Sequence, residues 1–465
     1  MPIILPANSA SSGGFNVDNS VRLDSASSAY LSRAGQGNSN QRTMTISVWV
    51  KRSKLGADQG LLNVGGSSYY SQLYFSSDDK LVLKNVFNGS GAGNYTTNRV
   101  FRDISSWYHI VAAIDTTQGT AGNRFKIYVN GVQETSFSTS DNPGSNQTLE
   151  FGSNTTHEIG NSPGYYGGYM CEYIYLDGTQ ATPTSFGEFD DDSGIWKPIE
   201  DVDGLTFGTV GFYLDFEDSS NLGNTVNGVT DFTSNNLAAV DQSTDTCTNN
   251  LATFNSLAYG TGGTAASFAE GNLEIIRGSA SWRTAPATIG LTQGKWYYEV
   301  KAGTIAGSGS QKLIQVGTVS ESGIYNCIDS YHESTTYSYA YHWSGQKYVN
   351  NSASSFGSAI TTGDIVMIAL DLDNNYIYAG LNGTWQNSGN PASGGSGTGA
   401  LSALQSGQTY FPTVSVYDSA HEINFGSPNF TISSGNSDGN GYGNFEYAVP
   451  GSYYSINTKN LAEYG

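Results

Sequence analysis

The chain of 465 residues is poor in charge, above all in positive charge. Asp, Glu, Lys and Arg make up only 13% of it, against about 25% in an average soluble domain. This scarcity excludes a coiled coil or helical bundle, because such folds depend on abundant Glu, Lys and Arg. Acidic residues outnumber basic ones by 40 to 20, which gives a net charge of −20. That field repels phosphate groups and argues against nucleic acid or an anionic membrane surface as the main partner.

Cysteine is scarce as well. Cys171, Cys247 and Cys327 lie far apart, and they form neither a Cys-x-x-Cys pair nor any spacing typical of a metal site. An odd and sparse number of cysteines does not suit a disulfide scaffold. We therefore expect free thiols in a chain that is made in a reducing cytosol.

Long hydrophobic runs are missing too. No window of the sequence approaches the roughly 20 apolar residues of a membrane-spanning helix. Residues 1–6 contain no basic residue and only a very short apolar run, unlike a secretory signal. The sequence therefore predicts a protein without membrane insertion that is made in the cytoplasm.

The chain is rich in glycine and tyrosine, with 58 and 31 residues respectively. Polar and apolar residues alternate over 45–50, as in a strand with one buried face. Asn130-Gly131 follows the candidate strand 126–129 and supplies the two positive φ values of a type I′ hairpin turn. Because no stretch shows a convincing helical period with caps, the sequence predicts an all-β protein.

Changes in composition divide the chain into five parts. Short strands with turn clusters fill residues 15–220 and again residues 256–430. Residues 221–255 are rich in Asn, Asp, Ser and Thr and are predicted to be a linker. Residues 1–14 and 431–465 are predicted to be an arm and a tail that have no core of their own.

The first strand-rich part resembles the laminin-G/concanavalin A-like jelly-roll family. Three segments carry the resemblance, in the family's order, at residues 46–50, 107–111 and 126–131. The likeness covers residues 15–220 and implies a sandwich of two antiparallel sheets. His109 belongs to the second of these segments, so we expect it to be a packed structural residue.

The second strand-rich part resembles the SPRY family, another concanavalin A-like sandwich. Tyr337, Tyr339, Tyr341 and Trp343 alternate within it and are predicted to face the sandwich core. The resemblance implies a recognition surface for peptides or proteins. It rests on ordered matches at residues 294–300, 316–317, 363–366, 369–371, 381–383, 411–415 and 424–426.

Together with the segments 241–250 and 455–463, the pairing of these two domains resembles structural proteins of tailed bacteriophages. The resemblance implies a virion component, such as a tail fibre, an appendage or a capsid decoration. It implies other virion proteins as partners, a homo-oligomer and binding to a host-surface glycan or protein. The arm 1–14 and the tail 431–465 would then order against neighbouring proteins.

A search for catalytic residues favours a protein that is not an enzyme. Glycosidases of this fold need paired carboxylates on one sheet face. Glu188 and Asp190 begin such a pattern, but Ser193 stands where the second Glu should be. The sequence contains neither a Gly-x-Ser-x-Gly elbow nor a His-Glu-x-x-His motif. A glycan-active enzyme and a cellular carbohydrate-binding module remain the alternatives.

The acidic run Asp190, Asp191 and Asp192 is a candidate calcium site. The family resemblance implies it, because laminin-G-type domains often bind Ca²⁺ through loop oxygens. The alternative is a solvated acidic loop. No other cofactor is expected.

Two pairs of tyrosines are candidate ligand-binding residues. Tyr165 and Tyr166 lie within the glycine-rich segment 164–169, and Tyr69 and Tyr70 follow two serines. Sugar sites set aromatic faces against C–H surfaces and add a few oriented polar groups. The alternative for all four residues is ordinary loop or interface packing.

Overall fold

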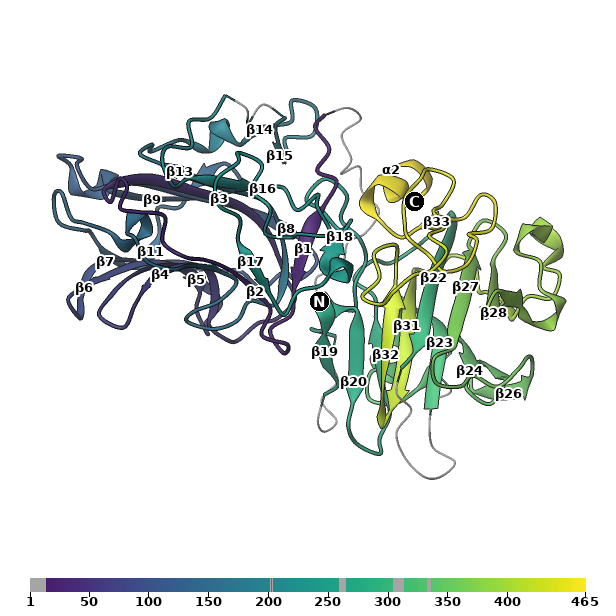
Figure 1. Cartoon of the computed structure of the whole chain (residues 1–465). Helices are drawn as coiled ribbons and strands as arrows, with labels where there is room; N and C mark the ends of the chain where they lie inside the picture. Colours follow the sequence, from purple (N-terminus) through teal and green to yellow (C-terminus); the bar gives the residue numbers. More distant parts are fainter. Residues whose placement is uncertain (1–13, 201, 203, 259–264, 304–312, 333–335) are drawn as a thin grey trace. The chain divides into compact units, whose positions relative to one another are not determined.

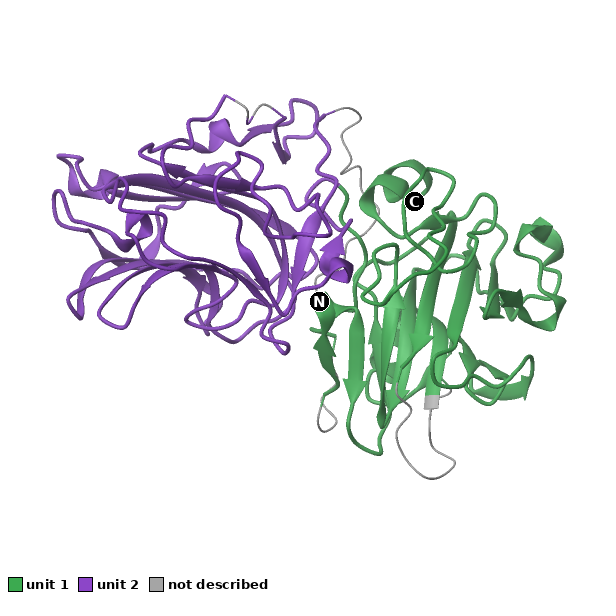
Figure 2. Ribbon diagram, viewed as in Figure 1, with its two compact units in different colours: residues 1–10, 249–465 green, residues 11–248 purple. Residues whose placement is uncertain are grey.

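The structure is a computed structural model, and its elements are nearly all strands. The prediction of an all-β protein is confirmed. The chain forms two compact units, divided between residues 248 and 249 (Figure 2). We call them the N-terminal unit and the C-terminal unit. The predicted arm falls outside the described residues except for Gly14. The structure describes residues 14–200, 202, 204–258, 265–303, 313–332 and 336–465.

The N-terminal unit is a sandwich of two eight-stranded antiparallel sheets (Figure 1). We call them the first and second sheet. The first sheet has the order β10-β9-β8-β3-β13-β1-β18, and β16 also pairs with β13. Its strands are β1 (Ser20–Leu23), β3 (Thr43–Arg52), β8 (Trp107–Asp115), β9 (Phe125–Val129), β10 (Val132–Gln133), β13 (Gly168–Asp177), β16 (Phe212–Leu214) and β18 (Gln242–Ser243).

The second sheet has the order β11-β7-β6-β5-β4-β12-β2-β17. The core between the two sheets includes Val48, Ile110 and Tyr173 from the first sheet and Leu62 and Leu73 from the second. Strand alternation places these apolar side chains on the inner faces. The strands are β2 (Tyr30–Arg33), β4 (Gln59–Gly66), β5 (Tyr69–Phe75), β6 (Lys80–Phe87), β7 (Ser90–Val100), β11 (Phe137–Asp141), β12 (His157–Ile159) and β17 (Thr233–Asn235).

The hairpin predicted at Asn130-Gly131 joins β9 to β10. Both residues have positive φ values, of 48° and 77°. Gly131 also lies against the ring of Trp196, where a Cβ atom would come within 2.3 Å of a ring carbon. Trp196 belongs to a small hairpin of β14 (Gly187–Phe189) and β15 (Trp196–Pro198). Only glycine satisfies both the backbone conformation and this close approach.

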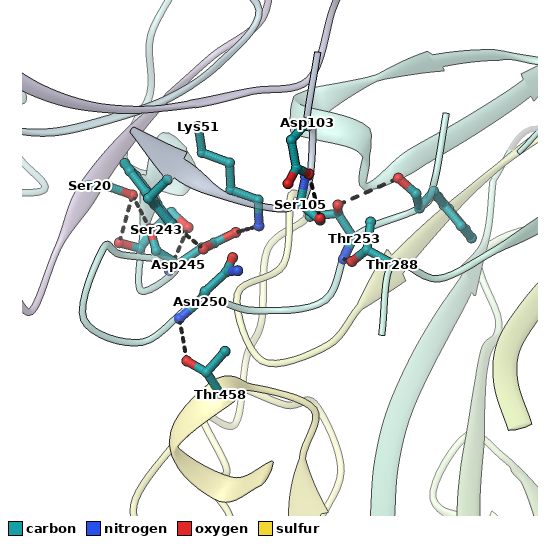
Figure 3. Close-up of polar contacts among 12 residues, drawn as sticks. Ser20, Lys51, Asp103, Ser105, Ser243, Asp245, Asn250, Thr253, Thr288 and Thr458 are labelled. Carbon is teal, nitrogen blue, oxygen red and sulfur yellow. Dashed lines mark hydrogen bonds and ion pairs between the residues drawn. The ribbon is translucent and has the colours of Figure 1, made fainter. Parts of the chain in front are cut away.

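Much of the segment predicted to be a linker, 221–255, belongs to the N-terminal sandwich. Its strand β17 pairs with β2 in the second sheet, and β18 pairs with β1 in the first. Beyond β18, Asp245 forms a buried ion pair with Lys51 of β3 at 2.7 Å (Figure 3). Both strands lie at sheet edges, where strands are often short and polar. Their composition therefore resembles that of a loop.

The C-terminal unit is also a two-sheet sandwich. A nine-stranded sheet has the order β19-β20-β32-β22-β27-β28-β29, with β30 on β28 and β33 on β22. Its strands are β19 (Ser267–Ala269), β20 (Glu274–Arg277), β22 (Lys295–Ala302), β27 (Ile365–Asp371), β28 (Tyr376–Leu381), β29 (Thr384–Trp385), β30 (Ser402–Ala403), β32 (Ser419–Asn424) and β33 (Tyr454–Ser455).

A six-stranded sheet, β21-β31-β23-β24-β25-β26, completes this sandwich. As predicted, Tyr339 and Tyr341 are buried in the core, and Tyr337 and Trp343 pack against it. Neither described α-helix, α1 (Glu321–Cys327) or α2 (Thr458–Tyr464), is long and apolar enough to cross a membrane. The six strands are β21 (Arg283–Pro286), β23 (Leu313–Ser320), β24 (Ser338–His342), β25 (Gln346–Val349), β26 (Ser352–Ser355) and β31 (Tyr410–Tyr417).

The tail, 431–465, is part of the C-terminal unit, and the prediction that it lacks a core is wrong. Phe445 and Tyr453 are buried in a cluster with Tyr297 of β22. The carboxylate of Glu299, also on β22, accepts hydrogen bonds from the backbone N–H groups of residues 446 and 447, at 2.9 and 2.8 Å. Buried aromatic rings and backbone hydrogen bonds together hold this polar segment on the sheet.

Candidate functional site

A row of polar residues crosses the outer face of the second sheet in the N-terminal unit. Each strand contributes one residue, and neighbours in the row are paired in register. Leu62, Leu73 and Leu83, adjacent in sequence to members of the row, point into the core, so the row faces outward. In sheet order the row is Asp141, Asn94, Lys84, Gln72, Asn63, Glu158, Ser32 and Thr233.

Side-chain hydrogen bonds fix the middle of this row. The Asn63 amide donates to Glu158 Oε2 at 2.9 Å, and the Gln72 amide donates to Asn63 Oδ1 at 3.0 Å. The loop after β12 joins the network, because Asn161 donates to Glu158 Oε1 at 3.2 Å. Gln72 also donates to Ser162 Oγ at 3.3 Å. Asn63 and Gln72 are nearly buried, and they hold the half-buried Glu158 carboxylate in a fixed orientation.

Two tyrosine rings flank the row on β5. Tyr70 and Tyr74 lie two residues before and after Gln72, so all three share the outer face. Both rings are half-buried, and burial raises the pKa of Tyr74, with smaller contributions from Asp58 and Tyr70. The Lys84 ammonium lies 5.6 Å from the centre of the Tyr70 ring. We call Tyr70, Tyr74, Lys84, Asn94 and Glu158 the β5 platform.

Of the predicted ligand-binding tyrosines, Tyr70 belongs to the platform and Tyr165 lies on the same outer face. The loop that carries Tyr165 crosses β4 at Gly60, where a Cβ atom would approach the Asn161 carbonyl to 2.1 Å. The Tyr165 ring is 36% exposed and 6.0 Å from the ring of Tyr30 on β2. The sequence analysis did not single out Tyr74, although strand alternation places it on the same face of β5 as Tyr70.

Tyr69 is the first residue of β5 and does not belong to the platform. Its ring is 43% exposed and packs edge-to-face against Phe87 at 5.2 Å, and its hydroxyl donates to Asn88 at 3.1 Å. Tyr166 is fully buried, and its hydroxyl donates to the Lys51 carbonyl at 3.0 Å. A buried ring cannot meet a ligand, so Tyr166 is removed from the candidate surface.

The candidate calcium loop forms a different structure. Asp190 accepts hydrogen bonds from the backbone and hydroxyl of Ser193 and lies 3.1 Å from Lys197 Nζ. The hydrogen bonds from Ser193 and the Lys197 ammonium lower the pKa of Asp190 to about 2. Asp191 and Asp192 point to solvent. Among the residues that the structure describes, no group of three or more His, Cys, Asp or Glu side chains could hold a metal ion.

His109 is the packed structural residue that its strand motif predicts. Trp196 Nε1, which can only donate, lies 2.9 Å from His109 Nδ1. The imidazole proton therefore resides on Nε2, which donates to Ser47 Oγ at 2.8 Å. The ring stacks on Trp49 at 4.7 Å, and burial lowers the pKa of His109 to about 3.

A serine–histidine contact in the C-terminal unit is also structural. His332 Nδ1 lies 2.8 Å from Ser415 Oγ, and Nε2 lies 2.6 Å from Thr413 Oγ1. All three residues are completely buried, and burial lowers the pKa of His332 to about 3. No substrate reaches the Ser415 hydroxyl in this arrangement, so the pair is not a nucleophile with its base.

Three solved structures that resemble parts of the chain are each less than 20% identical to it. One is the native heptameric SAP-like pentraxin from Limulus polyphemus, at 16% identity over 36% of this chain and 78% of that chain, with a TM-score of 0.28. Two others are SPRY domains. That of human HERC1 is 19% identical over 37% of this chain and 96% of that chain, with a TM-score of 0.29. A second human SPRY domain is 18% identical over 32% and 90%, with a TM-score of 0.25. No curated protein matches the chain.

Two family models match separate parts of the chain. Residues 24–185, within the N-terminal unit, match the concanavalin A-like lectin/glucanases superfamily. Residues 295–428, within the C-terminal unit, match the SPRY domain. Lectin-like sandwiches of this kind support a binding role. The chain therefore carries a concanavalin A-like domain followed by a SPRY domain, each folded as a β-sandwich.

Proposed function

We propose that the chain is a saccharide-binding protein without catalytic activity, and that the β5 platform is its binding surface. One observation carries the proposal: the tyrosine rings of the platform flank a hydrogen-bonded polar row on an outer sheet face. Tyrosine rings pack against the C–H faces of sugars, while carboxylate, amide and ammonium groups bind hydroxyls.

The dimensions of the platform suit an extended oligosaccharide. Glu158 and Asn94 are four strand spacings apart, which is roughly 19 Å at about 4.8 Å for each spacing. A chain of several sugar units that lies across the strands would contact both ends. The hydrogen bonds within the row already orient the Glu158 carboxylate, so little conformational entropy is lost on binding.

The carboxylates of the row support binding rather than hydrolysis. Glu158 and Asp141 are its only acidic members and lie five strand spacings apart, or roughly 24 Å. Glycosidases place their two carboxylates about 5 to 9.5 Å apart. Glu188 and Asp190, the pair considered from sequence, both lie within ion-pair distance of Lys197 instead.

We further propose that this binding takes place on a bacteriophage particle, where the chain is a tail-fibre, appendage or capsid-decoration protein. The resemblance of the domain pairing and of residues 241–250 and 455–463 to phage structural proteins supports this location. The partners would be other virion proteins, further copies of this chain and a host-surface glycan. A cellular carbohydrate-binding module is the second candidate, and the concanavalin A-like domain favours it equally.

A glycan array probed with the full chain tests the binding role. We expect retention on a defined set of oligosaccharides, and an affinity at least about tenfold weaker for Tyr70→Ala and for Tyr74→Ala, as for the loss of one stacked ring. Tyr325→Ala is the matched control, because Tyr325 is a 73% exposed tyrosine in the C-terminal unit. Equal binding by all variants would refute the platform, and shortened oligosaccharides after incubation would show an enzyme.

Mass spectrometry of purified phage particles tests the proposed location. Absence of the chain from the particle would exclude that location.

A further inference from the structure

The last segment of the N-terminal unit folds back over the outer face of the first sheet. β18 lies at the edge of this sheet, beside β1. Only two residues later, Asp245 reaches Lys51 on β3 at 2.7 Å (Figure 3). Asp245 also accepts a hydrogen bond from Trp107 Nε1 on β8 at 3.2 Å. Ser20 Oγ donates to the Asp245 carbonyl at 2.7 Å. The segment that follows β18 therefore crosses β1 and β13.

This crossing brings two cysteines together. Cys171 is fully buried on β13, in an outer-face cluster that includes Trp49, Trp107 and Tyr169. Cys247 packs against the same cluster and is partly exposed. Burial and a hydrogen bond with the Cys171 thiol raise the pKa of Cys247. The two cysteines thus pack in one side-chain cluster, although 75 residues separate them in the sequence.

A buried carboxyl group lies beside the thiol pair. Glu172 has a φ of 49°, and the pairing of β13 with β3 shifts register between Cys171 and Ile174. Glu172 Oε2 accepts a hydrogen bond from the Tyr213 hydroxyl at 2.8 Å. Its charge acts on the Cys247 thiol. That negative charge also raises the pKa of Cys247, so the reactive thiolate forms more readily as the pH rises.

We propose that Cys171 and Cys247 are a modification site, which a small-molecule disulfide such as oxidised glutathione converts into an intramolecular disulfide. The Cys247 thiolate attacks one sulfur of the reagent and releases one glutathione thiolate. The Cys171 thiolate then attacks the Cys247 sulfur and releases the second. The two thiol protons end on the two released glutathiones. Two cysteines are oxidised and one glutathione disulfide is reduced, so the exchange balances.

The disulfide would tie the segment after β18 to the centre of the first sheet. It would close a loop of 75 intervening residues, and long loops gain most from a crosslink in the chain-entropy description. The chain would then leave a reducing cytosol with free thiols and gain stability in an oxidising medium. This inference does not depend on the proposed function, because it uses no residue of the β5 platform.

The test uses the full chain, first reduced and then incubated with oxidised glutathione. We expect that titratable thiols fall from three to one, that a peptide linking Cys171 to Cys247 appears in a digest, and that the melting temperature rises by several degrees. Dithiothreitol should reverse all three changes. Cys327→Ser is the matched control, because Cys327 lies on α1 in the other unit, and this variant should still form the link.

Cys247→Ala separates the linkage from general effects of oxidation. Cys247 is partly exposed, so its loss should leave the reduced fold intact, which circular dichroism checks. The variant should show no gain in melting temperature with oxidised glutathione. Three thiols that persist in the folded wild-type chain, or a disulfide between two chains, would overturn the proposal.

Discussion

Asp245 and Lys51 form an ion pair at 2.7 Å in which both side chains are almost completely buried. Asp245 also accepts a hydrogen bond from Trp107 Nε1. A charge removed from water in this way is stable only with its partner in place. Asp245→Ala removes the carboxylate that pairs with the buried Lys51 ammonium, and we expect it to lower the free energy of unfolding by about 3 to 5 kcal/mol.

Urea denaturation followed by fluorescence measures this loss. Glu134→Gln is the control, because Glu134 pairs at 2.9 Å with Arg99, whose side chain is 43% exposed to solvent. That control should change the free energy of unfolding by less than about 1 kcal/mol. Equal effects of the two variants would show that the Asp245 pair contributes no more than a surface pair.

Trp196 and His109 provide a second test. Trp196→Phe keeps most of the ring but removes the Nε1–H donor to His109 Nδ1. An acceptor left unpaired in the interior should cost about 1 to 3 kcal/mol. Urea denaturation measures the cost, and nitrogen NMR of the wild type should show a neutral ring with the proton on Nε2. A proton on Nδ1 would contradict the assigned hydrogen bond.

Acid should destabilise the protein through its five buried histidines. Burial lowers the pKa of His109, His332 and His421 to about 3, and that of His157 and His342 to about 4, from 6.5 in each case. Each therefore stabilises the folded chain fully above pH 6.5. As the pH falls from 6.5 toward 4, only the unfolded chain takes up these protons. Each such histidine lowers the free energy of unfolding by about 1.4 kcal/mol per pH unit. Urea midpoints between pH 7 and 4 should fall steadily, and a flat profile would contradict the burial.

Glu172 has the opposite pH dependence. Burial raises its pKa from 4.5 to about 7, and the charges of Asp215 and Glu217 add to the shift. Its contribution to stability is therefore complete below pH 4.5 and is lost as the pH rises through 7. Glu172→Gln stays neutral beside Tyr213, so it should be more stable than the wild type at pH 8, by on the order of 3 kcal/mol.

Urea denaturation of both proteins at pH 5 and at pH 8 measures the difference. The two should be nearly equal at pH 5, where the wild-type carboxyl is largely protonated. A gain of the same size at both pH values would show that packing, rather than ionisation of Glu172, explains it.

The sequence determined the local structure of this protein. Alternation predicted the buried strand around Val48 and the core positions of Tyr339 and Tyr341, since a strand exposes its two faces in turn. The Asn130-Gly131 hairpin follows from backbone sterics alone. The order of the two domains also followed from short motifs within single strands.

The tertiary structure decided which distant residues meet. The β5 platform depends on the register of five strands, and Glu158 lies far from Tyr70 in the chain. No local pattern shows that Tyr165 faces outward while Tyr166 is buried. The crossing that brings Cys247 to Cys171 likewise depends on Asp245 reaching Lys51. Such contacts arise from long-range packing, in which burial and strand pairing outweigh the composition of each segment.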